Sequence, residues 1–408
     1  MKKFKKYLSY ILLICCILIG WGFKQAYTAD PIKADHIMQV VSADMKHERT
    51  ISWQLRDYRL PSYLEIRKKG DSESQLKTAL GEEISTSQGN QRRIYTVRLK
   101  NLEAGSEYEY RIRVEEWQST WRSFYTEAEA VNGASFKAMI FGDSQSINYD
   151  VWGQTAEKAW QANQDTAFFI NIGDLVDNGQ KDHEWQAWFR NAAELLEAIP
   201  FSPVMGNHEV YGLNATFTQP QTYLALFAVP GNGPDDLKRH AYSYDYGDIH
   251  FVVLNTQQGE LRKWNPNLLA DQKKWLAQDL AQTHKKWKVV LMHRGVWTNG
   301  QLNEIGRVFS PVFDDYQVDL VFSGHTHIYA RTAPLKKSTV DSSGTVYITT
   351  GRSGTKAYPN TQAQLVDQVF FNPVDMPNYI VLEGTRDSLQ IKAYKQDQTM
   401  IDQIEIKK

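Results

Sequence analysis

The chain has 408 residues, which is long enough for two domains, each with its own core. Its 46 lysines and arginines nearly balance 47 aspartates and glutamates, so the formal net charge is −1 at pH 7. This balance gives no reason to expect a nucleic-acid partner, and no run of like charges predicts a disordered tail.

The first 29 residues have the pattern of an export signal. Four lysines among the first six residues precede an apolar run at residues 8–23, an order that is typical of signal peptides. The run is shorter than the roughly 20 residues that span a bilayer comfortably. Ala29 suits the last position of a signal peptide, but Tyr27 lies two residues earlier, where cleavage sites prefer a small residue. Residues 1–29 are therefore predicted to be either a cleaved signal peptide or a retained membrane anchor.

Both forms of the signal predict that the rest of the chain is extracellular or at the cell surface. The membrane is an expected partner only if the segment stays uncleaved. The alternative, a buried helix of the folded domain, predicts no export. Cys15 and Cys16 both lie in the apolar run, so neither disulfides nor cysteine–metal sites are expected beyond it.

Residues 31–127 are predicted to form an all-β domain. Alternating strands without helical segments are typical of a β-sandwich. The expected strands cover residues 36–41, 50–54, 63–67, 93–99, 108–114 and 120–125. Residues 102–110 resemble the tyrosine corner of fibronectin type III domains, with a turn at Gly105, and Trp53 is the expected core tryptophan. No residue of this domain suggests chemistry, so we expect a fibronectin type III-like spacer or packing domain.

Residues 136–408 have a different pattern, because apolar strands alternate with amphipathic helices. Strands are expected at residues 138–141, 168–172, 250–254, 288–292 and 320–322, and helices at residues 154–162, 183–198, 271–283 and 302–314. Three late alternating segments, residues 379–383, 389–393 and 401–406, are expected to be antiparallel strands that complete a second sheet. The fold class is therefore α/β.

Five short motifs each follow an apolar run in this second domain. They are GDSQ at 142–145, GDLVD at 173–177, GNHE at 206–209, MHR at 292–294 and GHTH at 324–327. Strand ends meet at the edge where open α/β sheets bind ligands. Asp, Asn and His donors suit Zn, Mn or Fe. A carboxylate has two oxygens, so Asp174 is expected to bridge a pair of metal ions.

In this order the motifs resemble the calcineurin-like metallophosphoesterase family over about residues 136–330. With the β-sandwich in front, the chain resembles the purple acid phosphatase-like branch of that family. The resemblance implies a two-sheet β-sandwich flanked by helices for residues 136–408, preceded by the all-β sandwich. It also implies a phosphoric ester hydrolase with two divalent metal ions, which could be Mn, Zn or Fe.

The resemblance also implies the metal ligands. Asp143 and His327 would bind the first ion, Asn207, His293 and His325 the second, and Asp174 both. Gln145 departs from the family pattern because many members have histidine there; its amide oxygen would either ligate weakly or orient a water. The chain departs again at Asp177, where purple acid phosphatases have a tyrosine, so the protein is expected to be colourless.

The resemblance gives His208 and Asp177 the catalytic roles. A carboxylate partner would raise the basicity of His208 and keep it protonated near neutral pH. His208 would then protonate the leaving oxygen as a general acid. The alternative is that the two residues only stabilise a loop.

The charge of the predicted centre points to an anionic substrate. Two divalent ions carry more positive charge than Asp143 and Asp174 return, so the site should attract phosphate and support attack by a metal-activated hydroxide. We expect a small phosphate ester as substrate, with a phosphomonoesterase as the main hypothesis. A phosphodiesterase or nucleotide hydrolase on the same centre remains an alternative, as does a catalytically weak cell-surface binding protein.

Several neighbours of the motifs have open roles. Arg294 and Arg331 would either contact the phosphate ester or form salt bridges. Glu209 is expected to brace the loop of Asn207. Residues 211–240 are a hypothetical part of the substrate wall, and residues 351–358 are a loop that could approach the site.

Overall fold

The computed structural model describes residues 32–56, 59–85, 91–129 and 135–408. The predicted export signal lies outside these residues. Within them, no helix is both long enough and apolar enough to cross a bilayer. The chain separates into Met1–Lys33 and Ala34–Lys408, and the second of these units carries the features below.

The N-terminal domain contains only strands among its described residues. These are β1 (Asp35–Val40), β2 (Arg49–Arg56), β3 (Ser62–Lys68), β4 (Gln75–Thr78), β5 (Leu80–Ser85), β6 (Gln91–Leu99), β7 (Glu107–Val114), β8 (Trp117–Gln118) and β9 (Arg122–Tyr125). The six predicted strands are all present. The short strands β4, β5 and β8 were not predicted; all four residues of β4 are exposed, so it has no apolar alternation to detect.

Two predicted anchor residues of this domain lie as expected. Trp53 is fully buried, and its Nε1 donates to the hydroxyl of Ser62 at 2.9 Å. The hydroxyl of Tyr108 accepts a hydrogen bond from the backbone N–H of Glu103 at 2.9 Å, which is the contact that a tyrosine corner makes.

A ten-stranded sheet runs through both domains. Its order is β26-β25-β24-β10-β11-β12-β1-β2-β6-β5. The strands from the C-terminal domain are β10 (Phe136–Phe141), β11 (Thr166–Asn171), β12 (Phe201–Pro203), β24 (Asn378–Gly384), β25 (Ser388–Lys395) and β26 (Met400–Lys407). The domains join where β1 pairs in parallel with β12, with Val40 opposite Phe201.

This junction corrects the expectation of separate cores. Met38 and Ile94 of the N-terminal domain belong to the same hydrophobic cluster as Phe169 and Phe201. Unpaired strand edges expose backbone donors and acceptors, and pairing satisfies them. The N-terminal domain therefore covers the edge that β12 would otherwise present.

The last three strands also differ from the prediction. They extend the ten-stranded sheet rather than a second sheet, because β24 pairs antiparallel with β10, with Phe136 opposite Gly384. Alternation in a sequence predicts a strand but does not identify its partner.

The second sheet has seven strands in the order β13-β14-β15-β18-β22-β19-β23. They are β13 (Tyr242–Tyr246), β14 (Ile249–Leu254), β15 (Trp287–Met292), β18 (Leu320–Ser323), β19 (Tyr329–Thr332), β22 (Val346–Thr350) and β23 (Asp367–Phe371). Two small hairpins lie outside it: β16 (Trp297–Thr298) with β17 (Gln301–Leu302), and β20 (Leu335–Lys336) with β21 (Thr339–Val340). Phe168 of the first sheet meets Phe251 of the second edge to face, with ring centroids 5.4 Å apart.

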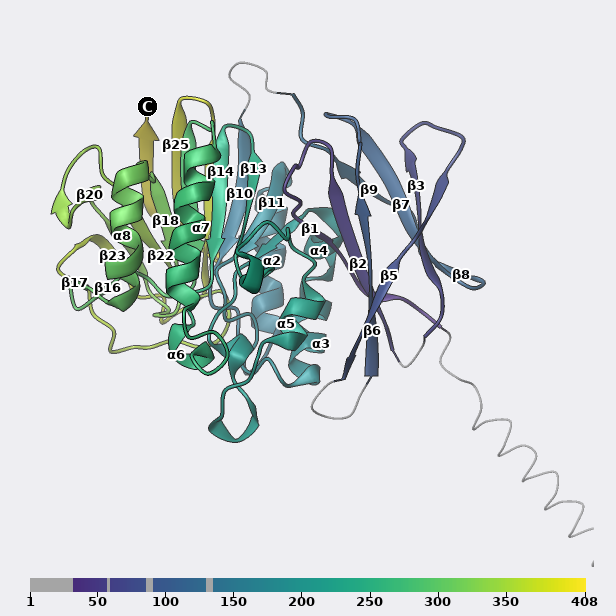
Figure 1. The fold of residues 1–408 in the computed structure, drawn as a ribbon, viewed down its shortest axis with the longest axis horizontal. Coiled ribbons are helices and arrows are strands. Elements are labelled where there is room, and N and C mark those ends of the chain that lie inside the picture. Colours follow the sequence, from purple (N-terminus) through teal and green to yellow (C-terminus); the bar gives the residue numbers. More distant parts are fainter. Residues whose placement is uncertain (1–31, 57–58, 86–90, 130–134) are drawn as a thin grey trace, which may run out of the picture. The chain divides into compact units, whose positions relative to one another are not determined.

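Helices flank the two sheets (Figure 1). They are α2 (Asp150–Ala162), α3 (Asp182–Asn191), α4 (Ala193–Ala198), α5 (Gln221–Leu226), α6 (Gln258–Leu261), α7 (Leu268–Gln282) and α8 (Glu304–Tyr316). The single helix predicted at residues 183–198 is two, divided at Ala192. Leu276 of α7 and Phe309 of α8 pack with Val290 of the second sheet. The fold is the predicted α/β class, with two sheets face to face and helices outside.

Candidate metal centre

The five motifs converge at the carboxyl ends of their strands. Asp143 follows β10, Asp174 follows β11, Asn207 follows β12, His293 follows β15, and His325 and His327 follow β18. All are buried except His325, which is partly exposed. The structure thus brings together every residue that the sequence predicted as a metal ligand.

Four of these residues have a backbone conformation that is rare outside glycine. The φ angles are 46° at Asp143, 51° at Asp174, 74° at His325 and 57° at His327. Left-handed φ values at non-glycine residues store strain and are concentrated at functional sites. Two of these residues follow strands of the ten-stranded sheet and two follow β18 of the seven-stranded sheet. Four strained residues where strand ends of the two sheets meet indicate a site rather than a simple turn.

The motif glycines let the strand ends approach each other. Gly173 has a φ of 91°, and a Cβ atom there would lie 2.7 Å from Nδ1 of His293. A Cβ atom at Gly206 would overlap the carboxylate of Asp174. Glycine is needed here both for backbone conformation and for space.

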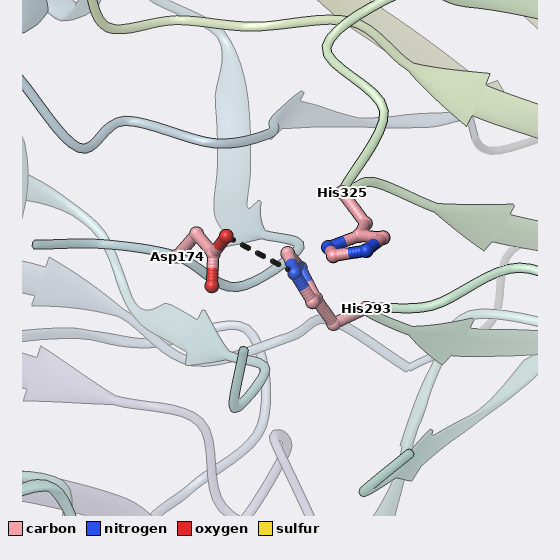
Figure 2. Close-up of side chains that lie close together, drawn as sticks. All are labelled: Asp174, His293 and His325. Carbon is pink, nitrogen blue, oxygen red and sulfur yellow. Dashed lines mark ion pairs between the residues drawn. The ribbon is translucent and has the colours of Figure 1, made fainter. Parts of the chain in front are cut away.

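One possible ligand cluster consists of Asp174, His293 and His325 (Figure 2). Their ligand atoms all lie within 4.8 Å of one another. Nε2 of His293 is 3.2 Å from Oδ2 of Asp174 and 3.1 Å from Oδ1 of Asn207. The rings of His293 and His325 are nearly perpendicular, with centroids 5.2 Å apart.

A second possible cluster consists of Asp143, Asp174 and His327, again with ligand atoms within 4.8 Å of one another. Nε2 of His327 is 3.3 Å from Oδ1 of Asp143. Asp174 belongs to both clusters. Its carboxylate therefore has the location that a shared ligand of two cations would need.

Gln145 lies beside this second cluster. Its Nε2 donates to Oδ2 of Asp174 at 3.1 Å and is 3.4 Å from Nε2 of His327. Its Oε1 is buried and has no hydrogen-bond partner among the described residues. A buried amide oxygen without a partner is costly, so it is available for a cation or a water molecule.

Backbone carbonyls orient two of the histidines. Nδ1 of His293 donates to the carbonyl of Ile172 at 2.8 Å, and Nδ1 of His327 donates to the carbonyl of Lys356 at 2.8 Å. Each bond leaves Nε2 directed at a carboxylate. Metal-binding histidines are usually held by a hydrogen bond of this kind on the other ring nitrogen.

Glu209 braces two of the motif loops, as expected. Its carboxylate accepts hydrogen bonds from the backbone N–H groups of Asp174, Leu175 and Gly206 at 3.0, 2.8 and 2.7 Å. It thereby links the turn after β11 to the turn after β12.

The electrostatics of the cluster favour a bound cation. Burial alone would raise the pKa of Asp174, but His293 and His208 outweigh it and hold that pKa well below its usual range. Burial would lower the pKa of His293, but the Asp174 carboxylate raises it to about 9. Burial lowers the pKa of His325 to about 3, so that ring is neutral. Carboxylate and amide oxygens together with imidazole nitrogens are a donor set that fits divalent metal ions.

His208 lies next to the centre but contacts a different atom of Asp177 from the one predicted. Its Nδ1 donates to the backbone carbonyl of Asp177 at 2.6 Å, whereas the Asp177 carboxylate is 3.6 Å away. Nε2 of His208 is 3.7 Å from Oδ2 of Asp174. The carboxylate of Asp177 also forms an ion pair with Lys356.

The two arginines near the motifs form salt bridges. The guanidinium of Arg294 donates to both oxygens of Glu260, at 3.0 and 2.6 Å. Arg331 is buried and pairs with Asp402 at 2.6 Å. The two alternatives for these arginines were contact with the phosphate ester and salt bridges, and the structure supports the salt bridges.

The loop at residues 351–358 does reach the site. Gly354 donates its N–H to the carbonyl of Asp143 at 3.1 Å, Lys356 contacts both His327 and Asp177, and the ring of Tyr358 lies 4.5 Å from that of His327. Sequence reasoning noticed this loop after an apolar strand but missed Lys356. The only signal in the sequence was the position of the loop.

Tyr211 was also missed as a neighbour of the centre. Its hydroxyl accepts a hydrogen bond from Nδ2 of Asn207 at 2.7 Å, and its ring centroid is 4.6 Å from that of His208. The sequence offered one indication of this role: Tyr211 begins the 211–240 segment, which was expected to line the substrate site.

Comparison with protein families agrees with this geometry. Residues 136–329 match the model of the calcineurin-like phosphoesterases, and residues 34–126 match that of the purple acid phosphatase N-terminal domain. The chain carries a calcineurin-like phosphoesterase domain behind a purple acid phosphatase N-terminal domain. The purple acid phosphatases are phosphoesterase hydrolases, and their family implies a dinuclear metal centre.

Individual relatives are purple acid phosphatases. The chain is 30% identical over 211 residues to purple acid phosphatase 23 of Arabidopsis thaliana, which covers 48% of this chain and 44% of that protein. It is 23% identical over 387 residues to purple acid phosphatase 22 of the same plant, covering 87% of this chain and 83% of that protein. The match to the first relative thus spans less than half of that relative's length.

A solved structure shares the fold. The purple acid phosphatase PPD1 from yellow lupin (Lupinus luteus) seeds aligns with a TM-score of 0.78 and 18% identity, covering 93% of this chain and 75% of that chain. The phosphoesterase fold and its N-terminal domain are therefore both present in this chain.

Proposed function

We propose that the protein hydrolyses phosphate esters, principally monoesters, with two divalent metal ions. Asp143, Asp174 and His327 would hold one ion, and Asp174, Asn207, His293 and His325 the other. The observation that carries the proposal is the shared position of Asp174, whose carboxylate belongs to both ligand clusters. Gln145 would complete the first cluster as a weak ligand or as the group that orients a water.

The bound ions would lower the pKa of a water nucleophile and stabilise charge on the phosphoryl oxygens. Two divalent ions bring four positive charges, whereas Asp143 and Asp174 return two negative ones. The remaining proposed ligands are neutral, so the loaded site attracts an anionic phosphate ester.

His208 is the proposed general acid. The carbonyl of Asp177 holds its Nδ1, which leaves Nε2 on the side of Asp174, 3.7 Å from Oδ2. A proton on Nε2 can therefore reach the leaving oxygen of an ester bound at the ions. Asp177 positions His208 through its backbone, while its carboxylate keeps Lys356 at the edge of the site.

The test uses the purified full-length protein and a panel of phosphomonoesters and phosphodiesters. Chelation should abolish hydrolysis, and Mn or Zn should restore it. Faster hydrolysis of diesters than of monoesters would favour the phosphodiesterase alternative. Two bound ions without turnover of any ester would favour a binding protein, the alternative that the unusual Gln145 suggests.

Export remains a proposal that depends on residues 1–29. We propose that the catalytic part lies outside the cytoplasm, either released or held by an uncleaved segment. Fractionation of cells that express the full chain, with N-terminal sequencing of the mature protein, tests both points. Recovery of the whole protein in the cytoplasm would reject export.

A further inference from the structure

A cavity of about 730 Å³ lies between β5 of the N-terminal domain and the segment that follows η1 (His208–Val210). Its walls include Glu82 and Glu83 from the N-terminal domain and Phe217, Arg239 and Trp264 from the phosphoesterase domain. This volume falls within the usual range of small-molecule sites, roughly 300–1,000 Å³. The mechanism proposed above assigns no role to this cavity.

A row of aromatic rings connects the cavity with the candidate general acid. The ring of Tyr211 is 4.6 Å from that of His208, and the ring of Phe217 is 6.0 Å from that of Tyr211. Tyr211 and Phe217 form an antiparallel bridge, and residues opposite each other in such a bridge direct their side chains to the same face. Phe217 is 48% exposed and belongs to the cavity wall.

The position of His208 identifies which part of a substrate would lie on this side. A general acid protonates the leaving oxygen, so the leaving group extends from the phosphorus toward His208. Gln180, three residues after Asp177, also lines the cavity. The segments that follow Asp177 and Tyr211 therefore each begin beside His208 and each contribute a residue to the cavity wall, Gln180 and Phe217.

The walls combine apolar rings with neutral polar groups. Phe217 and Trp264 provide the rings, and the polar side chains include Thr218, Gln219 and Gln221. Rings and closely spaced hydrogen-bonding groups together suit a ligand that has apolar faces and several hydroxyls.

The two carboxylates of the cavity wall each have an arginine partner, one within the wall and one outside it. Arg239 lies 3.8 Å from Glu82, and Glu83 pairs with Arg59 at 2.9 Å. Each carboxylate thus has a guanidinium partner, so the wall carries no excess charge that would favour an ionic ligand. The cavity therefore suits a neutral group.

We propose that this cavity binds the leaving group of the substrate, and that this group is a large, neutral, polyhydroxylated alcohol such as a nucleoside or a sugar. The inference rests on the proposed phosphomonoesterase function and gives its substrate class. It also gives the N-terminal domain a part in recognition, because β5 supplies Glu82 and Glu83 to the wall.

The experiment compares kcat/KM for adenosine 5′-monophosphate, glucose 6-phosphate and glycerol 1-phosphate with the metal-loaded full-length protein. All three esters release a primary alcohol, so differences in leaving-group chemistry are small. We expect at least one of the two larger esters to exceed glycerol phosphate by tenfold or more. Preference for the nucleotide identifies a nucleoside as the ligand, and preference for the hexose phosphate identifies a sugar.

Two variants link that preference to the cavity. Phe217→Ala removes a wall, and Gln221→Trp fills the space from the first residue of α5. Each variant should reduce the ratio of kcat/KM for the preferred large ester to kcat/KM for glycerol 1-phosphate at least threefold. A general loss of folding would instead lower kcat/KM for all three esters together. Met400→Ala is the matched control, since Met400 is a similarly exposed apolar residue on β26, 50% exposed, and should leave the ratio unchanged.

The outcomes separate this inference from the function on which it rests. Equal kcat/KM for all three esters overturns the cavity assignment but leaves the phosphatase intact. A preference that both variants retain overturns it as well. No hydrolysis of any ester by the metal-loaded protein rejects the proposed function itself.

Discussion

Lys356 and Asp177 form an ion pair beside His208. The carboxylate of Asp177 therefore has a cationic partner at the edge of the proposed site. The backbone carbonyl of Lys356 also holds the ring of His327. One residue of the 351–358 loop thus contacts both a proposed metal ligand and the proposed acid–base pair.

Removing the ammonium group of Lys356 should weaken phosphate binding. In Lys356→Met the carboxylate of Asp177 loses its partner and repels an anionic substrate, so KM and the inhibition constant of inorganic phosphate should rise about threefold to tenfold. The double variant Lys356→Met with Asp177→Asn should recover most of this loss. Steady-state kinetics of the wild type, the single variant and the double variant measure KM and phosphate inhibition. A double variant that binds substrate and phosphate as weakly as Lys356→Met would contradict the prediction.

Asp174 should be needed for both metal ions at once. Asp174→Ala removes the one carboxylate that the two clusters share, so bound metal and turnover should fall together. Metal content by elemental analysis, measured next to activity, is the readout. Asp235→Ala is the control, because the side chain of Asp235 is 97% exposed. Two retained ions in Asp174→Ala would refute the shared position.

His208 should matter for chemistry and not for metal binding. His208→Gln is expected to keep its metal and to lose roughly 100- to 10,000-fold in turnover, the usual contribution of a general acid. The loss should grow as the leaving group becomes more basic, which a series of substituted aryl phosphates measures. His284→Gln, at an exposed position of the chain, is the control. Loss of metal from His208→Gln would show that the residue is misassigned.

A buried histidine far from the motifs should make stability depend on pH. His250 donates to carboxylates on both sides, with Nδ1 2.7 Å from Asp245 and Nε2 2.8 Å from Asp279. Burial would lower its pKa, but these two hydrogen bonds outweigh burial and raise it to about 9. A pKa raised above the unfolded value of about 6.5 means that the stabilisation is complete below that pH and is lost as pH rises toward 9.

Urea unfolding between pH 6 and pH 9.5 measures this effect. Between pH 6 and pH 9.5, the free energy of unfolding of the wild-type protein should fall by on the order of 2 kcal/mol more than that of His250→Gln. Comparison with the variant cancels contributions from other groups, including Lys285, which lies 3.9 Å from Asp245. If the free energy of unfolding depends on pH equally in the two proteins, the charged form of His250 does not stabilise the fold.

Much of the site was predictable because its parts are local in sequence. Each motif follows an apolar strand, so the turn, the glycine and the polar side chain are encoded within a few residues. Asp143, Asp174 and His293 could each be assigned to the carboxyl end of a strand before any coordinates. The brace formed by Glu209 was predictable for the same reason. The single sheet edge expected for Asp143, Asp174 and His293 was wrong, because Asp143 and Asp174 follow β10 and β11 of the ten-stranded sheet, whereas His293 follows β15 of the seven-stranded sheet.

What the sequence by itself determined is most of the longer strands, the α/β class and the group of residues at the strand ends, because apolar periodicity and turn residues act over short distances. Only the tertiary structure decided which strands become neighbours, as when β1 pairs with β12, and which side chains meet across long separations, as Lys356 meets Asp177. Such contacts depend on how whole elements pack. No local pattern records that the hydrogen bond of His208 goes to the backbone carbonyl of Asp177, with the carboxylate farther away at 3.6 Å.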